Sequence, residues 1–425
     1  MKNLIVQIEI NGTGKYVGKI KGNSSEDAVF SYAENYLADP DCRPVSISLP
    51  LERRVFDVVS TKNFFEGLLP EGFTRRCVAA RMHADENDYL SILAELGREC
   101  LGAVKIFDEN DRTDMMEYRK LSAEEVLRFA REGASESAEL VARSHLSLTG
   151  ASGKAGLYYD EKKGEWYLPV GEAPSTHIVK QSHVRLEKIV TIEQLCLLAA
   201  RNLGIEIPES FIIQAGNQDE EVLFATKRYD RKILPGNRRL NGLVMPYRLH
   251  QEDFAQALGI ASAEKYEKNN AGYLRKMVEL IRNYSAEPLK DQLKLWDICI
   301  FNFLIGNTDN HIKNFSLLYS EDLKSVRLAP AYDMISTVIY ESSTENMALG
   351  INGKYDISDL KQEDFAAEAA WAGIGVKNAM KRFDIMASRF EGALKEACRL
   401  LMEQGFSEAD SICGQIMAKR GRYIF

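Results

Sequence analysis

The sequence lacks the features that mark several large protein classes. No apolar run approaches the roughly 20 residues of a membrane-spanning helix, and Met1–Ile10 carries Gln7 and Glu9 where a secretion signal needs unbroken apolar residues. Positive charge is also scarce, since 54 Lys and Arg stand against 62 Asp and Glu and give a net charge of −8. We therefore expect a cytoplasmic protein without membrane contact, and we exclude one that coats nucleic acid through bulk positive charge.

Patterns for disulfides, structural metals and the P-loop are missing as well. The seven cysteines form no CxxC pair and the six histidines form no HExxH motif. We therefore expect buried, reduced thiols and no structural metal site. Gly153-Lys154 is not part of a P-loop, because Ala155 follows instead of Ser or Thr and the first glycine of the motif would fall at Leu148.

What is present fits a globular chain with two or three domains. The sequence has 425 residues, of which 45% are apolar and 27% are charged. The alternation in Leu4–Ile10, the turn Asn11-Gly12 and the segment Tyr16–Ile20 predict an early β-hairpin. Short strands follow residue 146, and the chain is mostly helical after about residue 250. The sequence thus predicts an α+β fold with two lobes.

Two predicted helices frame the most informative part of the sequence. One covers Ile192–Leu203, with Thr191 as its amino-terminal cap and Gly204 as its end. The other begins at Pro288, carries an apolar stripe and ends at Gly306.

The loop after Gly306 carries the strongest catalytic pattern. Asp309 is followed five residues later by Asn314, between a buried helix and a strand, which is the spacing of a kinase catalytic loop. In such a loop the aspartate reaches the acceptor hydroxyl and the asparagine reaches a magnesium ion on the phosphates. Asp333 follows 19 residues after Asn314, where a kinase places its main magnesium ligand.

A kinase also needs a lysine for the nucleotide phosphates and a glutamate to hold that lysine. Lys180, at the end of a strand, and Glu193, in the next helix, are the candidates. Taken alone, they are better explained as a solvated lysine and as an acid that the helix dipole favours. Upstream, the small residues of Ser147–Ala155 would let backbone N–H groups approach phosphate oxygens.

Several longer stretches, which together extend over nearly the whole chain, share their residues with one known family. These stretches are Phe64–Gly72, Leu96–Val104, Ser147–Lys154, Lys227–Arg231, Arg248–Gly259, Thr308–Leu318 and Leu328–Ser336. Through them the chain resembles the HipA family of toxin serine/threonine kinases. The resemblance implies a two-lobed protein-kinase-like fold. Its parts would be an amino-terminal domain over 1–135, an ATP-binding lobe over 136–245 and a helical catalytic lobe over 246–425.

The resemblance also implies a role for each candidate residue. Asp309 would be the catalytic base, Asn314 and Asp333 would bind Mg²⁺, and Lys180 would hold the ATP phosphates. Ser147 stands where the family has its autophosphorylated serine, and a dianion there would compete for the groups that bind the nucleotide. The other residues expected at ATP are Thr149, Gly150, Ala151, Ser152, Gly153 and Lys154 in the phosphate loop, Lys227 and Tyr229 in the hinge, and His311. For His311, simple packing is an equal alternative.

The predicted function is that of an ATP- and Mg²⁺-dependent protein serine/threonine kinase, the toxin of a toxin–antitoxin system. A HipB-like antitoxin would bring it to operator DNA, and the substrate in the best-known members is an aminoacyl-tRNA synthetase. Two alternatives stay open, a small-molecule phosphotransferase and a catalytically silent co-repressor that binds the antitoxin. The basic residues within 227–239 are interpreted as a solvated loop face rather than a nucleotide or substrate patch.

Overall fold

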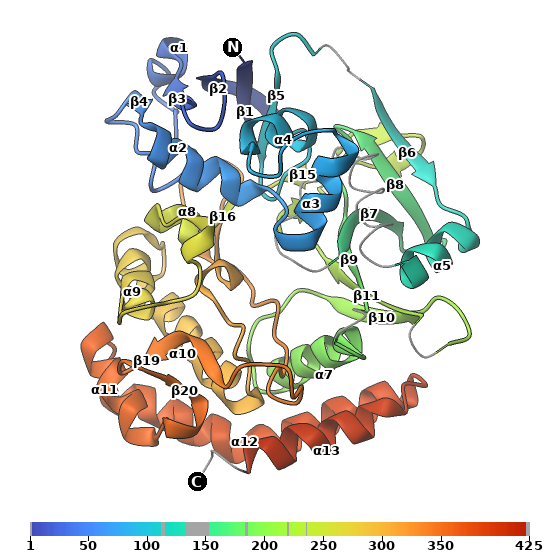
Figure 1. The fold of residues 1–425 in the computed structure, drawn as a ribbon, viewed down its shortest axis with the longest axis vertical. Helices are drawn as coiled ribbons and strands as arrows, with labels where there is room; N and C mark the ends of the chain where they lie inside the picture. The colour runs from blue at the N-terminus through green and yellow to red at the C-terminus, as the bar shows by residue number, and fades with distance from the viewer. Residues whose placement is uncertain are drawn as a thin grey trace. The chain divides into compact units, whose positions relative to one another are not determined.

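The computed structural model describes residues 2–111, 115–132, 153–182, 186–218, 221–234 and 236–421. The chain forms two compact units, each assembled from separated segments (Figure 1). Unit 1 comprises Met1–Arg185, Ile213–Ser262 and Leu318–Ser325, and unit 2 comprises Leu186–Ile212, Ala263–Leu317 and Val326–Phe425. The expected boundary near residue 135 lies outside the described residues and the one near 245 falls within unit 1, so the division into three domains stays a prediction.

Unit 1 begins with a five-stranded sheet in the order β4-β3-β2-β1-β5. Its first hairpin confirms the sequence prediction, because Leu4 faces Ile20 across the antiparallel strands and both are fully buried. Asn11 and Gly12 have φ values of 50° and 73°, as a tight two-residue hairpin turn requires. The elements of this region are β1 (Lys2–Ile10), β2 (Thr13–Gly22), β3 (Val29–Tyr32), α1 (Glu34–Leu37), β4 (Val55–Phe56), α2 (Val58–Phe65), η1 (Glu66–Leu68), α3 (Gly72–Arg81), α4 (Tyr89–Leu96) and β5 (Val104–Asp108).

A second sheet follows in the order β10-β11-β9-β7-β8-β6. Its centre is apolar, since Val179 on β9 faces Ala155 on one side and Ala225 on the other, and none is more than 2% exposed. Its elements are β6 (Met116–Lys120), α5 (Ala123–Glu132), β7 (Lys154–Asp160), β8 (Glu165–Gly171), β9 (His177–Gln181), β10 (Ser210–Gln214) and β11 (Val222–Lys227). Further short elements of unit 1 are β12 (Arg231–Lys232), β13 (Arg239–Leu240), β14 (Leu243–Val244), β15 (Tyr247–Arg248), β16 (Gln251–Asp253) and α8 (Phe254–Leu258).

Unit 2 is mainly helical, and a long, largely buried helix, α10 (Pro288–Ile305), runs through it. As predicted, α10 has proline in its first turn and ends at Gly306, whose φ of 69° closes the helix. Trp296, Ile300 and Phe303 on this helix are fully buried. Besides α10, the elements that follow Ala261 along the chain are η2 (Ser262–Glu264), α9 (Tyr273–Tyr284), η3 (Ile312–Asn314), β17 (Ser316–Tyr319), β18 (Val326–Leu328), β19 (Asn346–Ile351), β20 (Lys354–Asp356), η4 (Ile357–Asp359), α11 (Gln362–Ala372), α12 (Val376–Glu403) and α13 (Glu408–Arg420). Of these, η2 begins and β17 ends in segments assigned to unit 1.

One predicted helix start was wrong. Helix α7 (Ile189–Asn202) begins before the expected residue 192, so Thr191 lies inside the helix. Its hydroxyl donates to the Glu408 carboxylate of α13 at 3.2 Å instead of capping α7. A tertiary contact far along the chain therefore replaces the expected local one.

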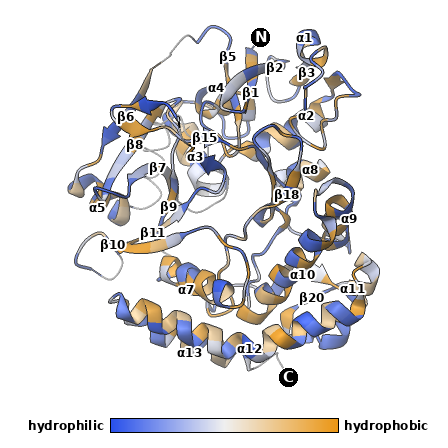
Figure 2. Ribbon diagram, turned by 180° about the vertical axis from the view of Figure 1, so that it is seen from behind, coloured by the Kyte–Doolittle hydropathy of each residue, from blue (hydrophilic) through white to orange (hydrophobic). Residues whose placement is uncertain are grey.

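Several sequence predictions about the whole chain can be compared with these elements. All seven cysteines are free thiols, five of them buried. Figure 2 shows hydrophilic and hydrophobic residues alternating along α12 and α13, as expected of helices with one buried face. Among the helices in the described part of the chain, none has the length and apolar character to cross a bilayer. The α+β class is confirmed, since unit 1 is rich in strands and unit 2 in helices.

Candidate active site

The loop after α10 rests on buried polar contacts within unit 2. Thr337 donates its backbone N–H to the Gly306 carbonyl at 3.0 Å, and its hydroxyl accepts the Thr308 N–H at 2.7 Å. Asn307 and Thr308 are 1% and 3% exposed, whereas Asp309, the next residue, is exposed. The buried residues Asn307 and Thr308 thus hold the loop in place, and the Asp309 carboxylate that follows them is accessible.

Asp309 and Asn314 lie on one closed loop. The Asn314 side-chain nitrogen Nδ2 donates to the Asp309 carbonyl at 3.0 Å, and the His311 backbone N–H donates to the same oxygen at 2.8 Å. Because the amide nitrogen is engaged, the Oδ1 oxygen of Asn314 is the atom available to a cation. The structure therefore brings together the two residues that the spacing singled out.

Asp333 stands on a second loop that is tied to the first. The Asn307 Nδ2 atom donates to the Asp333 carbonyl at 3.2 Å and to Asn302 Oδ1 on α10 at 2.8 Å. Asp333 has a φ of 52°, in the left-handed region that aspartate tolerates better than most residues. Such backbone conformations persist where the surroundings enforce them, and they cluster at functional sites.

The donor set of these loops fits magnesium. Within the described residues, no group of three or more His, Cys, Asp and Glu is placed to hold a metal. Mg²⁺ needs no such cage, because it is usually bound by one or two carboxylates, water and substrate phosphates. The Asp333 carboxylate and the Asn314 amide oxygen are hard oxygen donors of this kind.

A tyrosine that the sequence did not single out contacts the candidate base. The Tyr266 hydroxyl donates to Asp309 Oδ1 at 2.7 Å, and the Tyr266 ring packs edge-on against His311 with 5.2 Å between ring centroids. Tyr266 and Asp309 line a cavity of about 570 Å³, together with Thr308, Thr337, Asn346 and Tyr355. Packing is thus observed for His311, and its contact with nucleotide stays a prediction. No local signal marks Tyr266, which lies 43 residues before Asp309.

In unit 1, two of the predicted ATP-binding lysines stand opposite each other. Lys180 on β9 is the register partner of Lys154 on β7, so both side chains leave the same face of the sheet. They are 8% and 9% exposed, and the Lys180 ammonium lies 5.6 Å from the ring centroid of Phe224 on β11. Two cationic groups are therefore concentrated on one partly covered face.

Comparison with known proteins places the chain in a family. Residues 146–397 match the HipA-like C-terminal domain, and residues 8–107 match the HipA N-terminal domain. The chain belongs to the HipA family. The resemblance to the HipA family inferred from the motifs is therefore confirmed.

Individual HipA relatives extend over nearly the whole length. Protein Y4mE of Sinorhizobium fredii is 30% identical over 417 residues, or 95% of this chain and 96% of Y4mE. The serine/threonine-protein kinase toxin HipA of Shewanella oneidensis is 24% identical over 428 residues, or 96% of this chain and 94% of the toxin. A solved structure of Shewanella oneidensis HipA with HipB and operator DNA shares the fold at a TM-score of 0.79 and 21% identity, covering 99% of this chain and 97% of that one.

The basic residues within 227–239 were predicted to form a solvated loop face, and for part of them this prediction was wrong. That part is buried where the two HipA family regions meet within unit 1. The side chains of Arg228 and Arg231 are 0% and 1% exposed, so they are not a solvated loop face. Both contact Glu99 of the amino-terminal region, at 3.3 and 2.7 Å, and Arg248 reaches the other oxygen of that carboxylate at 2.7 Å. Asp230 pairs with Arg228 at 2.7 Å and accepts the Gly102 N–H at 2.7 Å.

This cluster is held in its charged form. Burial raises the pKa of the Glu99 carboxyl, but the charges of Arg231, Arg248 and Arg228 outweigh burial and hold that pKa at about 2. The pKa of Asp230 is likewise lowered, because Arg228 and Arg231 outweigh its burial. The cluster stands next to the expected nucleotide hinge, where Lys227 forms a 3.1 Å ion pair with Glu161 and Tyr229 donates its hydroxyl to Gln251.

The remaining site predictions have these positions. Glu193 lies on α7 in unit 2 and is 3% exposed. Gly153 is buried just before β7. Ser147, Thr149, Gly150, Ala151 and Ser152 lie outside the described residues.

Proposed function

We propose that this HipA-family protein is an ATP- and Mg²⁺-dependent protein serine/threonine kinase that acts as a toxin. The observation that carries the proposal is the pair of linked loops in unit 2. Asn314 closes the loop of Asp309, and Asn307 joins that loop to Asp333. A base, an amide oxygen and a second carboxylate are the parts that phosphoryl transfer requires there.

Each residue takes one role in the transfer. The exposed Asp309 carboxylate accepts the proton of the substrate hydroxyl as that oxygen attacks the γ-phosphorus. Asn314 and Asp333 would hold Mg²⁺, which neutralises charge on the phosphates when it is bound. Positioning of the hydroxyl and neutralisation of charge supply most of the rate.

The facing lysines suit the nucleotide phosphates. Like charges at facing positions of paired strands repel each other. A triphosphate is a polyanion that two cationic groups on one face of the sheet could contact together, which supports nucleotide binding beside Lys154 and Lys180. Their low exposure argues against the alternative of an ordinary solvated lysine.

We further propose a HipB-like DNA-binding antitoxin as partner, through which the complex reaches operator DNA. The support is the fold shared with a HipA that was solved with HipB and operator DNA. An aminoacyl-tRNA synthetase as substrate, autophosphorylation at Ser147 and a cytoplasmic location are carried forward as predictions from the family resemblance.

Intact-mass measurement after incubation with ATP and Mg²⁺ tests the kinase. We expect one added phosphoryl group in the wild type, none in Asp309→Ala, and none in Ser147→Ala. Calorimetry should show that Asp309→Ala still binds ATP, which separates lost chemistry from lost folding. If Ser147→Ala still gains a phosphoryl group, the kinase assignment stands and the modified residue is one other than Ser147.

Absence of both phosphorylation and ATP binding in the folded wild type would overturn the proposal and favour the silent co-repressor. Phosphorylation of aminoglycosides or similar hydroxylated molecules, without that of any protein, would instead favour the small-molecule phosphotransferase.

A further inference from the structure

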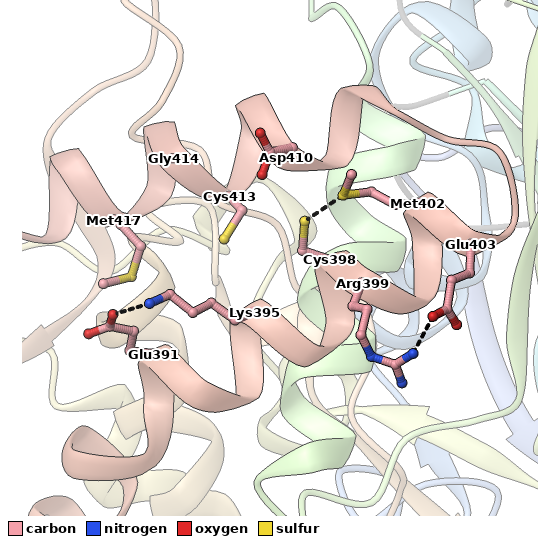
Figure 3. A pocket seen from close by; sticks show the side chains of 10 residues that line it. All are labelled: Glu391, Lys395, Cys398, Arg399, Met402, Glu403, Asp410, Cys413, Gly414 and Met417. Carbon is pink, nitrogen blue, oxygen red and sulfur yellow. Dashed lines mark hydrogen bonds and ion pairs between the residues drawn. The ribbon is translucent and has the colours of Figure 1, made fainter.

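Two cavities of unit 2 are lined in different ways. The groove of about 820 Å³ between α12 and α13 is lined by residues of these two helices, and its lysine and arginine side chains each pair with a glutamate of α12 (Figure 3). The cavity of about 570 Å³ beside Asp309 is instead lined by residues from several segments that lie far apart in the sequence. Glu267 is one of these residues, and its contacts join the segments to one another.

The Glu267 side chain connects β19 with the start of α9. Its Oε2 atom accepts the backbone N–H of Gly350 on β19 at 2.9 Å, and its Oε1 atom accepts the N–H of Gly272, directly before α9, at 2.6 Å. Glu267 is 8% exposed. Hydrogen bonds to an ionised carboxylate are among the strong ones in proteins, so this side chain fixes Gly350 and Gly272 relative to residue 267.

The backbone of Glu267 extends these contacts to the loop of the candidate base. The Glu267 N–H donates to the Ala348 carbonyl of β19 at 2.9 Å, and the Ala348 N–H donates to the Thr308 carbonyl at 3.0 Å. Thr308 directly precedes Asp309, and Tyr266, directly before Glu267, donates its hydroxyl to Asp309 Oδ1 at 2.7 Å. The contacts therefore form a closed ring that starts and ends at Glu267.

Burial alone does not hold the tyrosine and the base in place. Tyr266 is 42% exposed and Asp309 is exposed, whereas Glu267 and Ala348 are buried or nearly so. The direction in which the phenol meets the carboxylate therefore depends on the backbone at residues 266 and 267. We propose that Glu267 is a positioning residue of the phosphoryl-transfer site, which acts through Tyr266 to orient the Asp309 carboxylate. This role rests on the proposed kinase function.

Glu368 offers a matched control on the same hairpin. It borders a cavity of about 190 Å³ together with Glu267, and it is 2% exposed. Its Oε2 atom accepts the N–H of Asn352, in the turn between β19 and β20, at 2.8 Å and pairs with Arg275 at 2.9 Å. In the described part of the chain, Glu368 lines this small cavity and not the one beside Asp309. Its loss would loosen the hairpin without acting on the base.

Glu267→Gln keeps the size of the side chain and removes one acceptor. Glutamine has a single carbonyl oxygen, so it can accept from Gly350 or from Gly272, while its NH₂ group meets the other N–H. We expect kcat to fall by about tenfold, since a small misplacement of a reacting group costs that much or more. The KM for ATP should stay unchanged, because the change lies on the side of the acceptor hydroxyl.

Initial rates of ADP formation by the full chain at varied ATP measure kcat and KM. The double variant Tyr266→Phe/Glu267→Gln separates positioning from general loss of packing. Since Glu267 acts through the phenol hydroxyl, the double variant should have the kcat of Tyr266→Phe alone. Glu368→Gln should keep the wild-type kcat even where denaturant unfolding shows that it is less stable.

Three results would overturn the role of Glu267 and leave the kinase intact. They are a wild-type kcat in Glu267→Gln, losses that multiply in the double variant, and an equal loss of kcat in Glu368→Gln. If Glu267→Gln does not unfold cooperatively, Glu267→Asp replaces it in the same comparison, because its carboxylate keeps the charge and is one methylene short of the two N–H groups. A folded wild type that forms no ADP would overturn the proposed kinase and the positioning role together.

Discussion

Tyr266 makes a side-chain hydrogen bond to the candidate base. Its hydroxyl donates to Asp309 Oδ1 at 2.7 Å, and its ring is braced by His311. A hydrogen bond to a charged group is worth about 1.5–3 kcal/mol. Tyr266 therefore has the strength and the place to fix the orientation of the carboxylate.

Tyr266→Phe removes only this donor, and we expect kcat to fall by about tenfold with the KM for ATP unchanged. Initial rates at varied ATP would measure the split. Tyr273→Phe is the matched control, because the Tyr273 hydroxyl donates to the Glu264 carbonyl in the same unit and does not contact Asp309. An unchanged kcat in Tyr266→Phe, or an equal loss in the control, would contradict a positioning role.

Spacing along the chain could find Asp309, Asn314 and Asp333, because a loop between a helix and a strand keeps its residues close together. It could not find Tyr266, which reaches the same place from 43 residues away. Nor could it tell that Arg228 is buried, since its partner Glu99 lies 129 residues distant. The contacts that sequence reasoning missed are the long-range ones.

Glu252 gives unit 1 a distinct pH dependence. Its carboxylate accepts the Ile47 N–H at 3.1 Å and the hydroxyls of Ser46 and Tyr319. Burial nevertheless dominates and raises the pKa of Glu252 from 4.5 to about 7. Because the folded value is the higher one, the stability that protonated Glu252 provides is full below pH 4.5 and is lost as pH rises through about 7.

Glu252→Gln cannot ionise, so its free energy of unfolding relative to the wild type should increase between pH 5 and pH 8. The increase is on the order of 3 kcal/mol. Denaturant unfolding across this range would measure it. Parallel pH profiles for the two proteins would show that Glu252 titrates normally in the folded chain.

At the scale of elements, proline, glycine and turn residues predicted the ends of a helix or hairpin correctly where those ends depend on local sequence alone. Pro288 and Gly306 bound α10, and Asn11-Gly12 closes the first hairpin, as predicted. The start of α7 was wrong because Thr191 hydrogen-bonds to α13 instead of capping its own helix. A capping motif predicts a boundary only when no tertiary partner competes for the side chain.

The contact of β12 and β15 with the loop after α4 depends on Glu99. Glu99→Gln leaves Arg228, Arg231 and Arg248 buried with too little negative charge, so we expect a loss of about 3–5 kcal/mol in the free energy of unfolding. Glu109→Gln breaks a partly exposed ion pair with Lys19 and should cost at most about 1 kcal/mol. Similar losses in the two variants, measured by denaturant unfolding, would contradict a stabilising cluster.

The organisation of the whole molecule could not be predicted from composition, because the chain returns to unit 1 twice after leaving it. Residues 213–262 carry the three arginines whose partner Glu99 lies in the first segment. Boundaries drawn along the sequence follow changes in composition, whereas these units are defined by contacts between distant segments. The HipA N-terminal region is therefore an integral part of unit 1.

A chain that begins at residue 115 should fail to fold cooperatively. It lacks Glu9 and Glu99, so Arg248 loses both of these carboxylates, and Arg228 and Arg231 lose Glu99 and share Asp230 alone. Removing one partner of a buried ion pair costs about 3–5 kcal/mol. The loss of several such pairs is therefore comparable to the roughly 5–15 kcal/mol that stabilises a typical domain. Thermal unfolding followed by circular dichroism should lose its sharp transition, and co-expression of residues 1–110 as a separate chain should restore it. A cooperative transition near the wild-type temperature in the truncated chain alone would show that unit 1 does not need its first segment.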